Sequence, residues 1–573
     1  MRTHIDILPA VGAWLLLAAP TLAQEFQWLR HIGGQGMDFG RVSAEDDQGN
    51  FYVLVNYAGD TQGNPFPISH NNCYVDGDTV SGNADSFIAK YDPNGSLVWL
   101  KSCVSPGGAG LIDMVVDTTS QALYVVGTYQ GSCQLDTVGI AAGAFAAAML
   151  SRWTYDGACV WAKNVATSGT DLFGSQCFMR SIALSAQGQL VVSGSTTQYT
   201  TTYVNGQAFP FGSFLAGFDL DGGPLWARPF VQEYDQGVYP VFLASRGAFT
   251  YALSAYDLDV SDTISVDTIT LVGEEAEKGY FLTRLNTGTG DFQWLKRSGI
   301  GCGLMFNGQV LTTDGLGAPV IGGLFNDSAF FDNDTLLSTT PAVWSMFIAA
   351  HDTSGQVVEA KAFHAPGGVM CESVASEPGG GFYATGYAWP GTSDWDGIPF
   401  EVANIREVFV SKHAADGTCL GVFTDGSGRL NGSTVLPTTN GLYLGLYFSE
   451  DQANGTVTLG DSSFTSYGYR DVLIAKLDQV TGITPFRGAE NNALHIYANP
   501  NNGLCTIDLP QSLSATDDLV LSVYDNTGQL VQRVPLEFTD TGLKLDVRAQ
   551  AKGIYHVELG DGEQRYTGTI VFE

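Results

Sequence analysis

The chain has 573 residues, of which 26 are Lys or Arg and 59 are Asp or Glu, so its net charge at pH 7 is −33. Such a charge repels nucleic-acid phosphates and anionic membrane surfaces, and we exclude nucleic acid as a partner. Hydrophobic residues make up 44% and charged residues only 15%, so we expect a folded chain, and its length predicts two or more folded units.

Residues 1–23 have the pattern of a secretory signal peptide. Arg2 precedes an apolar run from Ile7 to Ala19, and small residues follow at Thr21 and Ala23. The run is too short to cross a bilayer, and no later window is long and apolar enough, so we expect no transmembrane segment. We predict cleavage after Ala23, export, and a mature protein that is secreted or lies on the outer cell surface.

One pattern recurs along residues 24–486: an apolar strand, a tight turn and a second strand with a tryptophan. The full copies are FIAKYDPNGSLVWLK from Phe87, AMLSRWTYDGACVWAK from Ala148, FLAGFDLDGGPLWAR from Phe214 and YFLTRLNTGTGDFQWLK from Tyr280. Weaker copies from Met346 and Val408 lack the tryptophan, and the seventh, VLIAKLDQVTG from Val472, stops at its turn. Each copy is accompanied by a second apolar hairpin, so four strands fit each repeat.

The strand missing from the seventh copy lies at the beginning of the mature chain. EFQWLRHIGG, which starts at Glu25, matches DFQWLKRSG, which starts at Asp291 inside a complete repeat. A ring that borrows an N-terminal strand for its last repeat has no exposed sheet edges. We therefore predict an all-β fold in which residues 24–486 form a seven-bladed β-propeller closed by the N-terminal strand.

The repeats resemble a bacterial β-propeller repeat family whose pattern is an aromatic residue, an apolar residue, AKYD, NG and W. The resemblance covers most of residues 25–480 and implies no shared catalytic residue. LNTGTGDFQW is also similar to the tryptophan-docking motif of quinoprotein propellers, through Asn286, Thr289, Gly290 and Trp294. That similarity implies that tryptophans hold adjacent blades together. Because quinoprotein dehydrogenases have eight blades, a count of seven argues against a redox cofactor, and we predict none.

Residues 487–573 differ from the repeats. Short alternating strands with NNG, NTG and KG turns predict a small β-sandwich. The order of motifs resembles the type A C-terminal sorting domain of the type IX secretion system of Bacteroidota. The matching motif residues are Tyr497, Asn499, Pro500, Gly503, Asp525, Gly528, Gly553 and Tyr555. The resemblance implies that the type IX secretion machinery is a partner; the alternative is an accessory sandwich without a sorting role. Ala498 and the acidic Glu573 depart from the usual motif.

Eight of the nine cysteines lie before residue 486 and predict disulfides in an exported protein, with their pairing left open, while Cys505 is left over as a buried thiol. None forms a CxxC pair, which argues against a zinc site. His351 and His413 occupy equivalent positions before a hairpin turn, so we expect them to pack within the fold. We find no sequence motif for a nucleophile, a phosphate loop or a metalloprotease.

Two loops carry candidate site residues. The segment GYAWPGTSDWDGIPF holds Tyr387, Trp389, Trp395 and Asp396, a combination that suits sugar stacking or a protein contact. The alternative is that these aromatic residues fill a gap between blades. DLDVSDTISVD holds Asp257, Asp259 and Asp262, which are candidate calcium ligands. The alternative is that strand alternation places these carboxylates on opposite faces.

Two functions from different classes fit these patterns. The first is a secreted or cell-surface binding or adhesion scaffold that recognises a glycan or protein ligand, and the absence of a catalytic motif favours it. The second is an extracellular polysaccharide hydrolase or lyase whose carboxylates meet in the propeller channel. A structural spacer without a ligand is a third reading. A cluster of inward-facing charged groups with shifted pKa values distinguishes the enzyme from the scaffold.

Overall fold

The computed structural model is all-β, and its described residues form strands β1 to β48 and no helix. The described residues are 26–34, 37–58, 73–75, 78–80, 86–168, 177–196, 202–209, 212–230, 232–233, 238–258, 263–266, 269–272, 277–305, 308–332, 334–340, 342–377, 380–448, 455–477, 494, 496–497, 500–507, 520–525, 530–535, 543–560 and 565–572. Nothing in these ranges forms a helix that could span a membrane. The expected signal peptide and the predicted boundary at residue 486 lie outside them, so both stay predictions.

Four antiparallel strands form the repeating unit of the fold, and we number these units in order along the chain. Unit 1 contains β2 (Met37–Glu45), β3 (Phe51–Ala58), β6 (Ser86–Tyr91) and β7 (Leu97–Val104). Unit 2 contains β8 (Ala109–Asp117), β9 (Ala122–Leu135), β10 (Val138–Thr154) and β11 (Cys159–Ser168). Unit 3 contains β12 (Cys177–Leu184), β13 (Gln189–Thr196), β16 (Gly212–Asp219) and β17 (Pro224–Pro229).

The same pairing continues through the later units. Unit 4 contains β19 (Val238–Arg246), β20 (Phe249–Leu258), β23 (Glu277–Asn286) and β24 (Phe292–Ser298). Unit 5 contains β26 (Leu311–Thr313), β27 (Pro319–Phe331), β29 (Ser345–His351) and β30 (Val357–Phe363). Unit 6 contains β31 (Val369–Ser376), β32 (Phe382–Ala388), β35 (Glu407–His413) and β36 (Cys419–Asp425). Unit 7 contains β37 (Leu430–Thr438), β38 (Gly441–Phe448), β41 (Asp471–Leu477) and β1 (Phe26–Gly33).

The N-terminal strand completes the last unit, as the repeat pattern predicted. β1 runs antiparallel to β41, with Trp28 opposite Lys476 and Ile32 opposite Val472. In the earlier units the tryptophan of the fourth strand has the same partner position, for example Trp99 opposite Lys90. β1 therefore supplies the fourth strand of unit 7.

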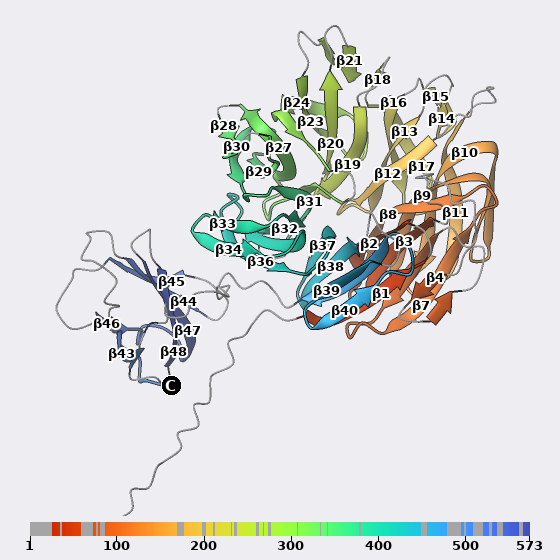
Figure 1. The fold of residues 1–573 in the computed structure, drawn as a ribbon. Coiled ribbons are helices and arrows are strands. Elements are labelled where there is room, and N and C mark those ends of the chain that lie inside the picture. Colours follow the sequence, from red (N-terminus) through yellow and green to blue (C-terminus); the bar gives the residue numbers. More distant parts are fainter. Residues whose placement is uncertain are drawn as a thin grey trace, which may run out of the picture.

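The first strands of the units lie next to one another in chain order. β2 contacts β8, β8 contacts β12, and the series continues through β19, β26, β31 and β37 until β37 contacts β2. Figure 1 shows the units in this order, from orange through green to blue, around their first strands. We call these seven strands the inner strands. Neighbouring units cover both faces of the second and third strands, which explains why stretches such as Phe51 to Val55 are continuously apolar and buried.

Tryptophans dock five of the units onto the turn of the next unit. The indole of Trp226 in unit 3 donates its N–H to the carbonyl of Thr287 at 2.8 Å and lies against Gly290 in the turn of unit 4. Gly290 has φ +73°, and a Cβ at this position would overlap with the indole. The same contact joins Trp28 to Gly95, Trp99 to Gly157, Trp161 to Gly222 and Trp294 to Gly355. The docking expected from the LNTGTGDFQW motif is therefore present, with Gly290 receiving a tryptophan from the preceding unit.

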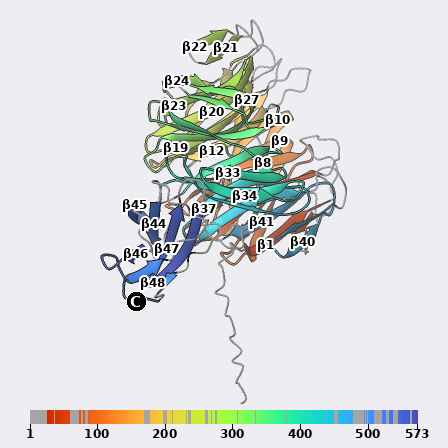
Figure 2. The ribbon, with the colours of Figure 1, turned by 60° about the vertical axis from the view of Figure 1, so that its left-hand side comes forward.

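A short hairpin stands between the second and third strands of each unit. The hairpin strands are β4 (Cys73–Val75) with β5 (Asp78–Val80), the facing ends of β9 and β10, β14 (Thr202–Val204) with β15 (Gln207–Phe209), β21 (Thr263–Val266) with β22 (Ile269–Val272), the end of β27 with β28 (Asp334–Leu337), β33 (Gly391–Trp395) with β34 (Ile398–Val402), and β39 (Thr456–Leu459) with β40 (Ser462–Thr465). Figure 2 shows β21 and β22 at the outer end of unit 4.

The hairpins connect a unit to the one before it. β4 pairs with β1, β9 with β7, and β14 with β11, so these hairpins extend the sheet of the preceding unit. Two short strands, β18 (Gln232–Glu233) and β25 (Ile300–Gly303), pair with β21 and β27 in the same way. The residue before the hairpin turn is apolar and at most 1% exposed in Val75, Leu135, Val204, Phe331, Trp395 and Leu459. We call these residues the hairpin plugs.

The C-terminal region forms two small sheets. One contains β42 (Ile496–Tyr497), β43 (Leu504–Ile507) and β46 (Leu543–Asp546), and the other contains β45 (Leu530–Pro535), β44 (Val520–Asp525), β47 (Gly553–Gly560) and β48 (Arg565–Phe572). Both sheets contribute to one cluster of buried side chains, with Ile507 and Leu545 from the first and Val523, Val557 and Ile570 from the second. A shared core of this kind gives the region a folded structure of its own.

Candidate functional site

The two aromatic residues at the end of β32 group with an arginine. The guanidinium of Arg406 lies 4.6 Å from the ring centre of Tyr387 and 5.3 Å from that of Trp389. Tyr387 and Trp389 meet edge to face at 5.1 Å. Trp389 and Arg406 are half-buried and the neighbouring Ile405 is 65% exposed, so the group reaches the surface. We call Tyr387, Trp389 and Arg406 the aromatic rim.

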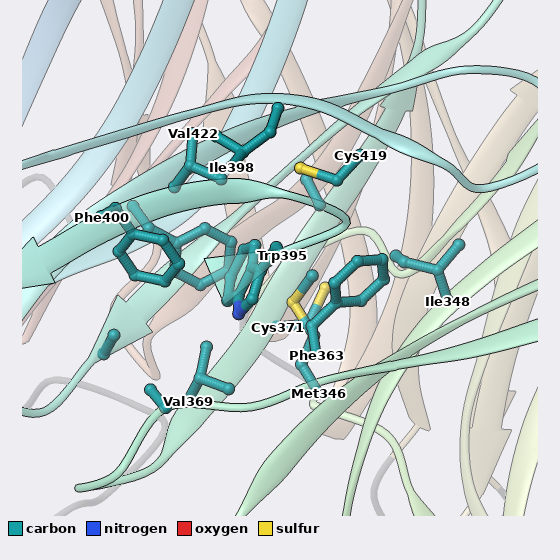
Figure 3. Close-up of a cluster of buried hydrophobic side chains, with 14 of the residues drawn as sticks. Met346, Ile348, Phe363, Val369, Cys371, Trp395, Ile398, Phe400, Cys419 and Val422 are labelled. Atoms are coloured by element: carbon teal, nitrogen blue, oxygen red, sulfur yellow. The ribbon is translucent and has the colours of Figure 1, made fainter. Parts of the chain in front are cut away.

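Trp395 and Asp396 do not belong to the aromatic rim. Trp395 is the hairpin plug of unit 6, and Figure 3 shows its indole enclosed by Phe363, Phe400 and other apolar side chains. It is 1% exposed and donates its N–H to the carbonyl of His364 at 2.8 Å. Asp396 is the turn residue that follows, with φ +53°, and accepts the backbone N–H of Cys419. Trp395 therefore fills a gap between units, as the alternative interpretation expected. The predicted ligand contact now rests on Tyr387 and Trp389 and stays a prediction.

The candidate calcium ligands lie mostly outside the described residues. Asp259 and Asp262 are among the residues that the structure leaves out, and only the backbone of Asp257 is described, in β20 opposite Lys278. Within the described ranges, no group of three His, Cys, Asp or Glu side chains is arranged to hold a metal ion. The calcium prediction remains a prediction.

A small cavity of about 130 Å³ lies among the inner strands of units 7, 1 and 2. Its lining consists of Phe39, Gly40, Arg41, Leu54, Asn56, Leu111, Ile112, Ser433 and Tyr447. Several polar groups of this lining connect neighbouring units: Asn56 donates to and accepts from the backbone of Leu111, and Ser433 donates to the carbonyl of Gly40. The cavity is smaller than pockets that enclose drug-sized ligands, which have about 300–1,000 Å³.

Charged groups surround Arg41 at this cavity. Burial lowers the pKa of the Arg41 guanidinium, while the charges of Asp113 and Glu372 act in the opposite direction. Burial raises the pKa of Asp113. Two hydrogen bonds act in the opposite direction: the carboxylate accepts the Ile182 N–H at 3.0 Å and the Ser181 hydroxyl at 2.9 Å. These bonds run from β8 to β12. Asp113 thus braces unit 2 against unit 3.

Glu372 braces another pair of units. It is fully buried in β31 and lies 3.4 Å from the hydroxyl of Tyr447 in β38 of the next unit. Arg180 in β12 also lies near Arg41, and burial followed by the Arg41 charge lowers the pKa of Arg180. The inner strands therefore carry a group of charged residues whose described hydrogen bonds mainly hold units together.

The two histidines expected to pack do so. His351 accepts or donates one hydrogen bond with the Tyr280 hydroxyl at 3.0 Å, and His413 stacks on Phe382 at 5.1 Å. Burial lowers the pKa of each to about 4, so both are neutral at pH 7. The same position holds the buried Tyr91 in unit 1, which explains the equivalence seen in sequence.

The arginines near the inner strands carried no sequence signal. Arg406 and Arg470 occupy the same place, directly before the third strand of units 6 and 7. Arg470 lies 4.5 Å from the ring of Phe39 and 4.7 Å from that of Tyr447, so it repeats the arrangement of the aromatic rim. The two arginines share a position relative to the third strand, and this match can be recognised only after the strand ends are known.

The sorting-motif residues are partly described. Gly503 has φ +91°, and a Cβ there would lie 2.5 Å from the Arg548 side chain, so this turn requires glycine. Tyr555 is buried and donates its hydroxyl hydrogen to the carbonyl of Ala551. Tyr497 is 45% exposed in β42. Pro500 follows β42, Asp525 ends β44 and Gly553 begins β47, while Asn499 and Gly528 lie outside the described residues.

Comparison with known proteins separates the two regions. Among solved structures, the chain is similar to BamB from Moraxella catarrhalis, with 12% identity, coverage of 69% of this chain and 93% of that chain, and a TM-score of 0.29. It is also similar to a Trypanosoma rangeli sialidase in complex with the inhibitor DANA, with 8% identity, coverage of 84% and 86%, and a TM-score of 0.33. Likenesses this weak carry no argument about fold or activity. No curated protein matches the chain.

The C-terminal region has a definite relative. Residues 495–573 match the family described as the secretion system C-terminal sorting domain. This domain marks proteins that type IX secretion exports to the cell surface or the extracellular space. The predicted sorting role and the predicted location are therefore confirmed, and this protein is exported by the type IX secretion system.

Proposed function

We propose that this protein is an exported binding or adhesion scaffold: a closed seven-bladed β-propeller that recognises an extracellular glycan or protein, followed by a β-sandwich sorting domain. The continuous contacts of the inner strands and the pairing of β1 with β41 support the closed ring. The core shared by the two C-terminal sheets supports the sandwich. A rigid ring suits presentation of a fixed contact surface.

The observation that carries the binding proposal is the aromatic rim. Trp389 is half-buried, and the Arg406 guanidinium lies over its ring and over that of Tyr387. The Arg406 Nη1 also donates to the Asn431 side chain at 3.1 Å. That hydrogen bond fixes the guanidinium in place before any ligand arrives. Tryptophan and arginine in such an arrangement are the side chains that dominate contact surfaces, and an indole face stacks well on sugar rings.

A second function rests on the charged residues near Arg41. Asp113 and Glu372 both act on the Arg41 guanidinium, and the pKa of Asp113 is raised, as a general acid requires. A polysaccharide hydrolase or lyase would use these carboxylates. Against this reading, Glu372 is fully buried and Asp113 is bonded to unit 3, so neither carboxylate is free to meet a large substrate.

The two functions separate in one experiment. The full chain is incubated with an array of soluble polysaccharides and extracellular proteins, with and without calcium, and both retention and release of new reducing ends are measured. The scaffold predicts retention without release. Trp389→Ala and Arg406→Ala should each reduce retention at least tenfold, whereas Leu316→Ala, a change at a turn residue that is 92% exposed, should leave it unchanged.

Release of new reducing ends would overturn the scaffold in favour of the hydrolase or lyase, provided that Asp113→Asn abolishes it. Retention that survives both rim variants would move the contact surface away from Trp389 and Arg406. A requirement for calcium would return attention to Asp257, Asp259 and Asp262, the predicted cation ligands.

A further inference from the structure

Two cysteines from different units face each other inside the protein. Cys103 lies in β7, the fourth strand of unit 1, and Cys133 lies in the part of β9 that forms the hairpin of unit 2. β7 and β9 pair with Cys103 opposite Leu135. Cys133 precedes Leu135 by two residues and therefore lies on the same face of its strand, diagonal to Cys103.

The two sulfur atoms are close and buried. The Sγ atoms lie 3.0 Å apart, Cys103 is 0% exposed and Cys133 is 3% exposed. Both belong to one apolar cluster that includes Leu111, Tyr129 and the hairpin plug Leu135. A separation of this size lets a small rotation of the side chains bring the sulfur atoms to bonding distance, since the strand pairing already holds the two backbones together.

We propose that Cys103 and Cys133 form a disulfide in the exported protein. The export route makes this chemistry available, because disulfides form and persist outside the cytoplasm. In the reaction, the two thiols transfer two electrons and two protons to the disulfide of an oxidised protein or small-molecule partner. The partner leaves as two thiols, and one S–S bond joins Cys103 to Cys133.

The position of the bond gives it a structural role. It would link the outer strand of unit 1 covalently to the hairpin of unit 2, at the same interface where Trp99 docks onto Gly157. Because the sulfur atoms are enclosed in the folded chain, oxidation has to occur while the chain is folding, and the finished bond is shielded from soluble reductants.

Cys159 is the third cysteine near this pair and serves as the matched control. It belongs to the same apolar cluster, but its thiol is directed toward the carbonyl of Trp161 at 3.6 Å. Burial raises the pKa of the Cys159 thiol to about 12, which keeps it protonated. A disulfide that is selected by geometry therefore joins Cys103 to Cys133 and leaves Cys159 reduced.

The chain offers a direct test, because one tryptic peptide, residues 102–152, contains Cys103 and Cys133 and no other cysteine. The full chain is produced in an oxidising compartment, unfolded without reductant, treated with a thiol-alkylating reagent and digested with trypsin. We expect peptide 102–152 to carry no alkyl group and to accept two after reduction. Additional cleavage before Asp113 and Asp117 should leave two fragments joined by the disulfide.

Variants distinguish this bond from other pairings. Cys159→Ala should leave the result for peptide 102–152 unchanged, whereas Cys133→Ala should make Cys103 available to the alkylating reagent after unfolding. Reduction in the unfolded state, followed by refolding with reductant present, should lower the melting temperature of the wild type and not that of the double variant Cys103→Ala with Cys133→Ala. Alkylation of both cysteines in the unreduced wild type would overturn the proposal, as would a disulfide between peptide 102–152 and the Cys159 peptide.

Discussion

The interface of units 3 and 4 and the interface of units 5 and 6 are built in different ways, and the difference shows how the repeat tolerates change. At the interface of units 3 and 4, Trp226 lies on Gly290 and donates a hydrogen bond to the turn. At the interface of units 5 and 6, Glu359 occupies the tryptophan position, opposite Ala350, and a Cβ on the turn residue Gly417 would come no closer than 3.9 Å to other atoms. The turn at Gly417 is therefore open, whereas the turn at Gly290 is covered by an indole.

A different tryptophan stabilises the open interface. The hairpin plug Trp395 packs against Phe363 of unit 5 at 5.3 Å and against Phe409 of unit 6 at 5.4 Å. In unit 2, which receives a docked tryptophan from unit 1, the plug is the smaller Leu135. The comparison teaches that the buried aromatic volume between two units can be supplied either at the turn or at the hairpin.

The largest effect is expected from Trp395→Ala. Removing a fully buried indole should lower the free energy of unfolding by about 3–5 kcal/mol, because a cavity forms and the hydrogen bond to His364 is lost. Denaturant unfolding of the full chain measures this change. A loss below about 1 kcal/mol would contradict the role of Trp395 as the main support of this interface.

The turn glycines provide a matched pair. Gly290 and Gly417 have φ values of +73° and +83°, so Ala at either position pays a similar backbone cost of about 1–2 kcal/mol. Gly290→Ala also displaces the Trp226 indole, which adds about 1–3 kcal/mol. Unfolding of the two variants should therefore differ by this second amount. Equal losses would mean that the tryptophan contact contributes little.

The buried histidines of units 5 and 6 predict a pH dependence. Burial lowers the pKa of His351 and His413 from 6.5 to about 4. Between these values the unfolded chain binds a proton at each histidine and the folded chain does not, so stability is present above pH 6.5 and is lost as the pH falls toward 4. The loss is about 3 kcal/mol for each histidine.

Denaturant midpoints measured from pH 7 to pH 4 check this expectation. Unit 3 has the buried Phe218 at the position of His413. The variant His413→Phe should therefore lose less stability between pH 7 and pH 4, by the contribution of one histidine. An unchanged slope would show that His413 is protonated in the folded state. The carboxylates contribute equally to the pH dependence of the wild type and of His413→Phe, so their effect cancels when the two are compared.

The smallest effect is expected from filling the open turn. Glu359→Trp places an indole at the position equivalent to Trp226, which docks unit 3 onto unit 4. The open turn at Gly417 leaves room for this indole. Burial of part of the ring should raise the free energy of unfolding by about 1 kcal/mol. Glu359→Ala is the control, since loss of the half-exposed contact between Glu359 and Lys361 should change stability by less than about 0.5 kcal/mol. Destabilisation by the tryptophan would show that Trp395 has already closed the space.

Much of the fold could be predicted from residue patterns because those patterns are local. The turn glycines and the recurring tryptophan revealed the repeat, and the isolated strand at Phe26–Gly33 revealed how the last repeat is completed. The candidate site could be predicted only in part. Tyr387, Trp389 and Trp395 look alike in sequence, yet the first two meet Arg406 near the surface and the third lies in the core.

The sequence by itself determined the all-β class, the repeating hairpins, the closing strand and the sorting domain, because each depends on turn residues and alternation within a short segment. Tertiary structure alone decided the partners across units: Arg41 with Asp113 and Glu372, and Cys103 with Cys133. Strand pairing between units brings together residues that are 30 to several hundred positions apart, and no local pattern records which neighbour a side chain will meet.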